Sequence, residues 1–585
     1  MHSQFFCPVF SLLLTLSLVA QPNAMADTHN PNQRPNIIIM LADDLGWADV
    51  GFHGNTEIET PSLDRLAREG VQLDRFYTAP ICSPSRSALM TGRDPMVLGT
   101  AYGVIMPWNN HAVAGNETFM PQRFKDAGYQ TAMIGKWHLG HSQPEHHPNQ
   151  RGFDHFYGHL HSEVNYFPPF LRQGGIDFQR NGQSIAFPQP SEELAGSEGD
   201  GHAQTSAPEE NKNEENYETF LLAKEAIEFI ESRDRAKPFF LYLPFIAPHT
   251  PLQAPAALLK KYENINTHLE PARSADTDNT RTLSKWLLQP SARPAYAAVV
   301  DAMDQAIGRV LDALDREEIA DNTLVLFMSD NGGAAYSVGG ADNYPLRGGK
   351  GDTYEGGIRV VATMRWPNIL SAGERYDSII TMMDVFPTLA SAASIETNAQ
   401  KELHGRDMWE AVSNNNPVSL DHYVHFVSEI PSKDYYNLTI FNEQWKLVQI
   451  VDQKQTEMQV ENQLFRISDD PYEHHNLAEQ YPLVVTELSK KLNQWRDSSP
   501  KNPVRNSLVP PPGWRSPLDW TDYIQADYLP FANDQSQAHE ANDQSHAHEP
   551  NDTDNGNTGK ANGKASSRLP NHLNTECEQY RSETP

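Results

Sequence analysis

The chain has 585 residues, and its 46 basic and 76 acidic side chains give a formal net charge of −30 at pH 7. Because so acidic a chain repels a phosphate backbone, we expect no nucleic-acid partner. Three cysteines are too few for a disulfide framework, and a chain of this length can bury a large core without one.

The N-terminus has the features of a secretory signal peptide. Val9 to Ala20 is an apolar run interrupted only by Ser and Thr, too short to cross a bilayer, and Ala24-Met25-Ala26 is a small-x-small cleavage pattern. A buried N-terminal helix is the alternative. We expect residues 1–26 to be removed and the protein to be exported, to the periplasm or the medium, with no membrane-spanning segment.

Two predicted strands end in pairs of oxygen-bearing side chains. Each strand is a continuous apolar run, typical of a parallel sheet covered on both faces. Ligands of open α/β sheets bind at the carboxyl ends of strands, so four hard oxygen donors without a soft ligand favour Ca²⁺ or Mg²⁺ over zinc. A turn or a helix cap is the alternative for each pair. The strands and pairs are Pro35–Ala42 with Asp43 and Asp44, and Thr323–Ser329 with Asp330 and Asn331.

The most specific stretch is Cys82-Ser83-Pro84-Ser85-Arg86, which continues to Thr91-Gly92-Arg93. A Pro two residues after a Cys, with helix formers behind it, predicts that Cys82 lies at the start of a helix, where anions bind. Arg86 follows one turn later and would bring a guanidinium to the same anion. For a Cys and an Arg taken alone, an ordinary buried thiol is the alternative.

Cationic residues follow two further predicted strands and a glycine-rich loop. A Lys and a His that lie two residues apart on an extended segment, such as Lys136 and His138, point to the same side of it. The glycine-rich loop lacks the Walker spacing of a phosphate loop. For the others, an ordinary strand end or loop is the alternative. The cationic residues are Lys136 and His138 after Tyr129–Gly135, His249 after Pro238–Leu243, and Arg347 and Lys350 in the loop, which also contains Asn343.

Together these motifs resemble the signatures of type I sulfatases, and the glycine-rich loop resembles that of arylsulfatase B-like members. The resemblance covers about residues 34 to 480. It implies that a formylglycine-generating enzyme oxidises Cys82 to Cα-formylglycine. It also implies one Ca²⁺ per chain, held by Asp43, Asp44, the matured residue 82, Asp330 and Asn331.

The resemblance further implies catalytic roles for Cys82, Arg86 and four of these cationic residues. Hydration of the aldehyde at Cys82 gives a diol whose oxygen attacks sulfur, and Arg86 orients that diol. Lys136 and Lys350 balance charge on the sulfuryl oxygens, while His249, with Lys350, protonates the departing alcohol. His138 takes a proton as sulfate leaves.

Strands alternating with amphipathic stretches such as Phe220–Ile230 and Val300–Leu314 predict an α/β fold with a doubly wound, mostly parallel sheet. By the resemblance this is an alkaline-phosphatase-like domain spanning residues 34–400. Short strands and a helix predict a smaller α+β subdomain, with an antiparallel sheet, at 401–530: Tyr423–Val427, Tyr436–Phe441, Trp445–Val451, Gln463–Ile467 and Pro482–Trp495. Polar composition predicts poorly ordered insertions at Gln189–Asn216 and Ile265–Ser291, and a low-complexity tail at 531–585.

Export and the arylsulfatase B resemblance predict a sulfated oligo- or polysaccharide as substrate. Aromatic, imidazole and amide side chains suit sugar rings and hydroxyls. A phosphonate or phosphodiester hydrolase of the same superfamily is one alternative. A catalytically silent glycan-binding relative is another, although a binder has no use for the whole catalytic set. The candidate substrate-binding residues are Trp108, His159, His161, Asn343 and Arg347.

Overall fold

The protein is described here by a computed structural model. The expected signal peptide, the expected tail and most of both expected insertions lie outside the described residues. The described end of the first insertion, Glu214–Asn216, forms the short 3-10 helix η6. No helix within the described part of the chain is both long and apolar enough for a membrane span. The described residues are 34–185, 187, 214–267, 292–335, 340–430, 435–452, 459–504 and 510–524.

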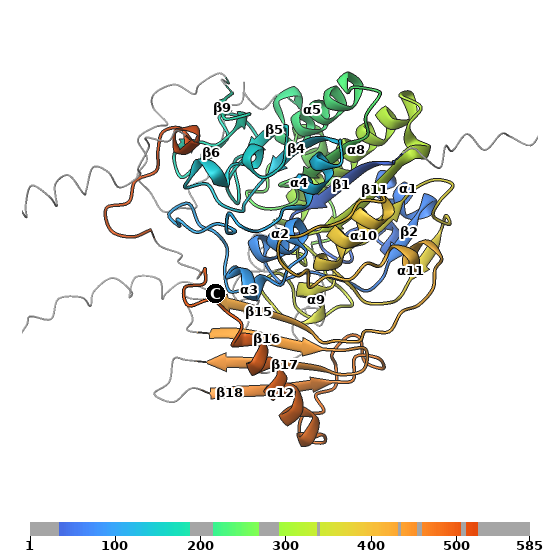
Figure 1. Cartoon of the computed structure of the whole chain (residues 1–585), viewed down its shortest axis with the longest axis vertical. Helices are drawn as coiled ribbons and strands as arrows, with labels where there is room; N and C mark the ends of the chain where they lie inside the picture. The colour runs from blue at the N-terminus through green and yellow to red at the C-terminus, as the bar shows by residue number, and fades with distance from the viewer. Residues whose placement is uncertain are drawn as a thin grey trace, which may run out of the picture. The chain divides into compact units, whose positions relative to one another are not determined.

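A ten-stranded sheet forms the centre of the fold (Figure 1). Its five middle strands, β11, β1, β10, β4 and β5, are all parallel, while β12 and β8 run antiparallel to their neighbours. The predicted mostly parallel α/β sheet is therefore confirmed. In order across the sheet, the strands are β13 (Glu374–Tyr376), β2 (Val71–Leu73), β12 (Ala362–Arg365), β11 (Thr323–Ser329), β1 (Asn36–Ala42), β10 (Phe239–Pro244), β4 (Gln130–Lys136), β5 (His155–His159), β8 (Gln179–Arg180) and β9 (Gln183–Ser184).

Helices cover both faces of this sheet. Side chains alternate along a strand, so Ile38 and Met40 of β1 pack into one apolar cluster while Ile37 and Ile39 pack into another. Burying each such side chain stabilises the fold by about 1.5–3 kcal/mol. The first cluster includes α5 (Glu218–Ser232) and α8 (Ala292–Arg316), and the second includes α2 (Cys82–Thr91), α4 (Met120–Asp126) and α10 (Val385–Ala392).

The C-terminal part forms a separate antiparallel sheet with a helix against it, as predicted. Leu488 and Leu492 of α12 (Pro482–Arg496) pack into the apolar cluster of this sheet. The strand expected to begin at Gln463 begins earlier, at Gln459. The sequence did not predict this start, because the first residues of the strand are exposed and give no alternating apolar pattern. The strands are β15 (Val424–Ile430), β16 (Tyr435–Phe441), β17 (Lys446–Asp452) and β18 (Gln459–Phe465), in that order (Figure 1).

A buried ion network joins this sheet to helix α9 (Glu355–Ile358). Lys446 Nζ lies 2.8 Å from Glu355 Oε1 and 2.8 Å from Glu473 Oε1, and all three side chains are buried. Tyr77 donates a hydrogen bond of 2.9 Å to Glu355 Oε2. We call these four residues the Lys446 network. It fixes the segment that directly follows the glycine-rich loop.

Candidate active site

Four adjacent parallel strands, β11, β1, β10 and β4, deliver the predicted site residues to one edge of the sheet. Because neighbouring parallel strands end at the same edge, residues far apart in the sequence come into contact there. Helix α2 and the glycine-rich loop add the rest. We call the following nine residues the strand-end cluster: Asp43 and Asp44 after β1, Asp330 and Asn331 after β11, Lys136 at the end of β4, His249 beyond β10, Cys82 and Arg86 on α2, and Lys350.

Asp43 is a fully buried carboxylate of the cluster. Lys136 Nζ forms an ion pair with Asp43 Oδ2, and Arg86 Nη2 lies 3.2 Å from the same oxygen. Burial raises the pKa of Asp43, but the cations Lys136, His249 and Arg86 outweigh it and hold the pKa below its usual range. Asp43 is therefore ionised, and its other oxygen accepts a hydrogen bond of 3.4 Å from Cys82 Sγ.

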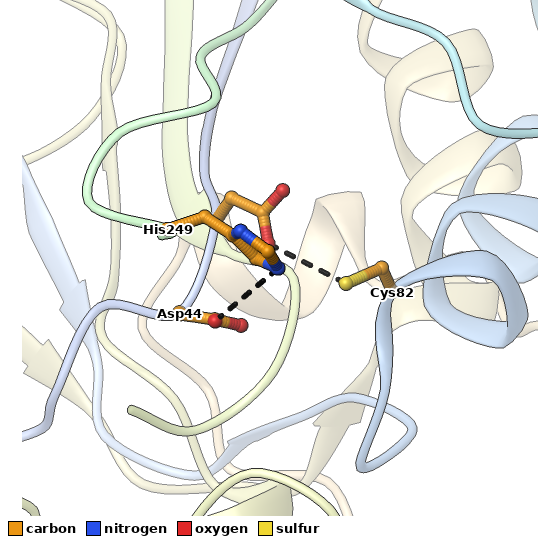
Figure 2. Close-up of side chains that lie close together, drawn as sticks. Asp44, Cys82 and His249 are labelled. Atoms are coloured by element: carbon orange, nitrogen blue, oxygen red, sulfur yellow. Dashed lines mark hydrogen bonds and ion pairs between the residues drawn. The ribbon is translucent and has the colours of Figure 1, made fainter. Parts of the chain in front are cut away.

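Asp44 bridges the other half of the cluster. Its φ of 71° is in the left-handed region, which Asp adopts more readily than most residues and which turns its carboxylate into the site. Lys350 Nζ lies 2.8 Å from Asp44 Oδ2, and Asn331 Nδ2 donates to Asp44 Oδ1 at 2.8 Å. Figure 2 shows His249 and Asp44 pointing toward each other, with Nε2 3.7 Å from Oδ2, and Cys82 facing them.

Cys82 begins helix α2, as predicted, and is 2% exposed. Burial, together with Asp330 and Asp43, raises the pKa of Cys82, so the unmodified side chain is a neutral thiol and a poor nucleophile. Arg86 lies one turn on, donating to Asp330 Oδ2 at 3.0 Å and to the carbonyl of Lys136 at 3.0 Å. These contacts lock the guanidinium beside the sulfur.

The cluster fits a divalent cation. Asp330 Oδ1 and Asn331 Oδ1 are buried and accept no hydrogen bond from any described residue. Burial and the neighbouring Asp43 raise the pKa of Asp330 to about 6, which reflects the mutual repulsion of carboxylates that a cation would relieve. Ligand atoms of Asp43, Asp44, Cys82 and His249 also lie within 4.8 Å of one another. The donors are mostly hard oxygens.

His138 lies beside this cluster at the end of β4, with φ 59°. Its Nε2 is 3.1 Å from the carbonyl oxygen of Ile105, so Nε2 carries the proton in the neutral ring. Nδ1 is buried, has no hydrogen-bond partner among the described residues and keeps its lone pair. Burial, with Lys136 and Arg86 nearby, lowers the pKa of His138, so the ring is neutral.

The side chains of the five candidate substrate-binding residues contact neighbouring loops, and His159 also pairs with Lys136 between strands β5 and β4. His159 Nδ1 is 3.0 Å from the carbonyl of His161, and His161 Nδ1 is 2.8 Å from Asp177 Oδ2. Both histidines are buried. Trp108 is 8% exposed and packs edge-to-face on Trp514 at 5.8 Å between ring centroids.

The two loop candidates also hold structure together. Asn343 donates to the carbonyl of Gly333 and accepts from its N–H, both at 2.9 Å. Arg347 stacks on Tyr354, 4.0 Å from the ring centroid, and donates to the carbonyl of Glu473 at 3.2 Å. The described contacts therefore place these residues in support of the glycine-rich loop.

Sequence reasoning did not single out Glu163 or Trp520. Glu163 Oε2 lies 3.6 Å from His249 Nδ1 and its other oxygen pairs with Arg172. Trp520, in the 3-10 helix η11 (Trp520–Ile524), stacks on His161 at 3.8 Å between centroids. Neither residue lies in a motif, so only the folded chain shows where they are.

This arrangement is that of a hydrolase of sulfuric esters, and the comparison with family models agrees. The model described as Sulfatase matches residues 35–395, and the chain belongs to the sulfatase family. A second model, described as N-sulphoglucosamine sulphohydrolase, C-terminal, matches residues 350–498.

Particular relatives support the same conclusion. The chain is 30% identical over 522 residues to arylsulfatase J of Mus musculus, covering 81% of this chain and 78% of the relative. It is 33% identical over 393 residues to N-acetylgalactosamine-6-sulfatase of Homo sapiens, covering 64% and 65%. The crystal structure of Ps i-CgsB in complex with k-i-k-neocarrahexaose superposes with a TM-score of 0.65 and 32% identity, covering 81% and 95%. The type I sulfatase family and the alkaline-phosphatase-like fold are confirmed, whereas the closer likeness to arylsulfatase B stays a prediction.

Proposed function

We propose that this sulfatase is exported and removes sulfate esters from a sulfated oligo- or polysaccharide, using formylglycine at position 82 and Ca²⁺. The strand-end cluster carries the proposal, because it surrounds a buried Cys82 with cations and unpartnered oxygen donors. The names of two relatives support a sugar substrate: one is an N-acetylgalactosamine-6-sulfatase, and the other was crystallised with a neocarrahexaose. The signal-peptide pattern at 1–26 supports export.

The chain's own residues would hold both groups that the reaction needs. Asp43, Asp44, Asp330 and Asn331 would hold the Ca²⁺, which when bound supplies positive charge beside the sulfuryl oxygens. The neutral thiol of Cys82 is inert, which supports its maturation to an aldehyde whose hydrate supplies an oxygen nucleophile. The formylglycine-generating enzyme would be the partner in that maturation.

Cationic side chains would bind and orient the sulfate group. Arg86 is held by Asp330 and by the Lys136 carbonyl, so its guanidinium stays fixed beside residue 82. Lys136 and Lys350, paired with Asp43 and Asp44, would stabilise charge that develops on the sulfuryl oxygens. Because these donors are already in place, little reorganisation is needed during the reaction.

Two histidines would move the protons. His249 Nδ1 lies 2.6 Å from the carbonyl of Thr250, which leaves Nε2 directed into the cluster to protonate the departing alcohol. His138 keeps a free lone pair on Nδ1 and would accept the proton released as sulfate leaves. Because Nδ1 donates to the Thr250 carbonyl, Nε2 would donate only from the doubly protonated ring. Burial and Lys350 lower the pKa of His249, so that protonated ring is a stronger acid than a free imidazolium.

The experiment measures sulfate release by purified protein from sulfated oligosaccharides, sulfated polymers, an aryl sulfate and a phosphonate monoester. We expect the highest kcat/KM on a sulfated sugar. Peptide mass spectrometry on the same preparation should show the loss of the thiol mass at position 82. An aryl sulfate turned over fastest, with no sugar turned over, would contradict the carbohydrate assignment. Full activity with only unmodified Cys82 would contradict the formylglycine assignment.

A further inference from the structure

A second cavity, outside the strand-end cluster, is lined by arginine and aromatic side chains. Its volume is about 400 Å³, within the range of small-molecule sites. No Asp or Glu is among the described residues that line it, although the whole chain has a net charge of −30. We call it the Arg75 pocket. The lining residues that matter here are Arg75, Arg359, Arg375, Trp47, His53 and Tyr472.

The three guanidiniums differ in how well nearby carboxylates balance them. Arg375 pairs with Asp74, with Nε 2.9 Å from Oδ2. Arg359 Nη1 lies 3.9 Å from Glu355, a carboxylate that the Lys446 network already neutralises. Arg75 forms no ion pair and its side chain no hydrogen bond with any described residue. The pocket therefore has unbalanced positive charge, concentrated at Arg75.

The walls of the pocket are held rigidly. Arg359 Nε donates to the carbonyl of Asp74 at 2.7 Å, and its Cζ lies 4.9 Å from the Trp47 ring centroid. The His53 ring packs on Trp47 at 4.1 Å between centroids, and its Nδ1 is 2.8 Å from the Trp47 carbonyl. Little side-chain entropy would be lost on binding a ligand.

His53 also reports the electrostatic character of the pocket. Burial lowers the pKa of His53 to about 4, and Arg359 and Arg375 add to the effect. At neutral pH the ring is therefore uncharged. Since Nδ1 donates to the Trp47 carbonyl, Nε2 is left as an acceptor that suits a hydroxyl group. Tyr472, 38% exposed, offers an aromatic ring on which a sugar can pack.

The loops that carry part of the catalytic cluster also form this pocket. Trp47 is three residues beyond Asp44, on the same loop. Pro345 and Leu346 line the pocket, and the glycine-rich loop that contains them continues to Lys350, which pairs with Asp44. The Trp47 N–H donates to Asn343 Oδ1 at 3.4 Å and joins the two loops. The pocket and the cluster are therefore built from neighbouring parts of the same two loops.

We propose that the Arg75 pocket binds a second sulfated sugar unit of the same oligosaccharide whose reacting sulfate ester occupies the strand-end cluster. Guanidiniums bind a sulfate group through paired, charge-assisted hydrogen bonds. His53 accepts from a sugar hydroxyl, and Tyr472 packs on the ring. This inference rests on the proposed carbohydrate function. It makes the enzyme selective for substrates that carry sulfate on more than one sugar.

The test compares an oligosaccharide sulfated on two sugar units with the same oligosaccharide sulfated only on the reacting unit. The readout is the ratio of kcat/KM for the first to kcat/KM for the second. We expect Arg75→Gln to lower this ratio about tenfold, mainly through KM, because a charge-assisted interaction is lost. Arg75→Lys should lower it less. The matched control Arg316→Gln removes an exposed guanidinium elsewhere and should leave the ratio unchanged.

The outcomes separate this inference from the proposed function. The pocket assignment would be overturned if the ratio were unchanged in Arg75→Gln, including the case in which kcat/KM falls equally for both oligosaccharides. The wild-type sulfatase activity on sugars would then still stand. A wild-type enzyme that releases sulfate from neither sugar but from an aryl sulfate would overturn both. Equal thermal stability of Arg75→Gln and Arg316→Gln would show that the ratio reports binding rather than unfolding.

Discussion

The strand-end cluster and the Lys446 network are two buried concentrations of charge that differ in how their oxygens are used. In the Lys446 network, one ammonium lies 2.8 Å from two carboxylates, and Tyr77 and the Glu355 N–H donate to the remaining oxygens. In the strand-end cluster, Asp330 Oδ1 and Asn331 Oδ1 have no partner among the described residues. In the Lys446 network every carboxylate oxygen has an ion pair or a hydrogen bond with a described residue, whereas in the strand-end cluster two side-chain oxygens have neither.

This difference separates a structural ion network from a ligand site. Burying an unpaired charge or an unpartnered oxygen costs several kcal/mol, so a group of unpartnered oxygens at one place indicates a site that a ligand would complete. The Lys446 network joins helix α9 to the C-terminal sheet. The strand-end cluster leaves donors for a cation and for a sulfate group. Both clusters can be tested by removing one charge.

The largest effect is expected in the strand-end cluster. Asp44→Ala removes an oxygen donor and the partner of Lys350, so activity should fall by about 10²–10³-fold, as when one preorganised electrostatic group is lost. Sulfate release and bound calcium per chain would be measured, with circular dichroism to show a retained fold. Chelator-treated, metal-free protein should lose activity as well. Undiminished turnover in that protein would contradict the metal assignment.

The second effect concerns stability. Lys446→Met leaves Glu355 and Glu473 buried without a cation and should lower the free energy of unfolding by about 3–5 kcal/mol. Adding Glu355→Gln and Glu473→Gln to that variant should restore most of the lost free energy of unfolding, because the uncompensated charges are gone. Urea denaturation measures the free energy of unfolding of both variants.

The matched control is Lys491→Met on α12. That lysine is 4.0 Å from Glu487, its side chain is 38% exposed, and its Nζ lies 4.8 Å from the Tyr423 ring centroid, so its loss should cost about 1 kcal/mol. Equal losses in Lys446→Met and Lys491→Met would show that the Lys446 network contributes no more than a surface pair.

The sequence predicts the strand-end cluster but not the Lys446 network, for a physical reason. Asp43 and Asp330 directly follow apolar strands, so the strand pattern in the sequence also shows where these acids lie in the fold. Lys446 and Glu355 lie on a strand and a helix of different parts of the chain, and no local pattern shows that they meet. The same holds for the Arg75 pocket, whose arginines are up to 300 residues apart in the sequence (375 − 75 = 300).

The fold follows the same rule. Long apolar strands and amphipathic helices were predictable from their periodicity, and the parallel sheet follows from their alternation. Where the pattern fails, as at the exposed start of β18, the predicted boundary is wrong. The buried contacts of His159 and His161 could not be predicted, because their burial depends on the loop that carries Asp177.

A third, smaller effect tests a buried carboxylate that has no cation. Glu218 is fully buried, and its nearest basic group, His159 Nε2, is 4.0 Å away. Burial raises the pKa of Glu218 to about 8, so the folded state holds the proton longer than the unfolded chain does. Stability from this group is complete below about pH 4.3, its unfolded pKa, and is lost as pH rises toward 8.

Glu218→Gln should therefore match the wild type in stability near pH 4 and exceed it near pH 8. The slope of the difference should reach at most about 1.4 kcal/mol per pH unit. Urea denaturation at several pH values measures it. Glu228→Gln, on the exposed side of the same helix, should show no such trend. A difference that stays constant or shrinks as pH rises would show that the pKa of Glu218 is not raised in the folded protein.

The smallest effect is expected from removing the tail at 531–585, which lies outside the described residues. Its sequence is polar and charged and has no periodic apolar residues. A chain ending at Pro530 should keep the activity and melting temperature of the full chain, because a segment so polar has no face to bury. The matched comparison is a chain ending at Val504, which also loses Trp520. That side chain is fully buried and donates to the Arg172 carbonyl at 3.0 Å, so its removal should lower the melting temperature by several degrees. A melting temperature lowered already in the chain ending at Pro530 would show that the tail docks on the folded enzyme.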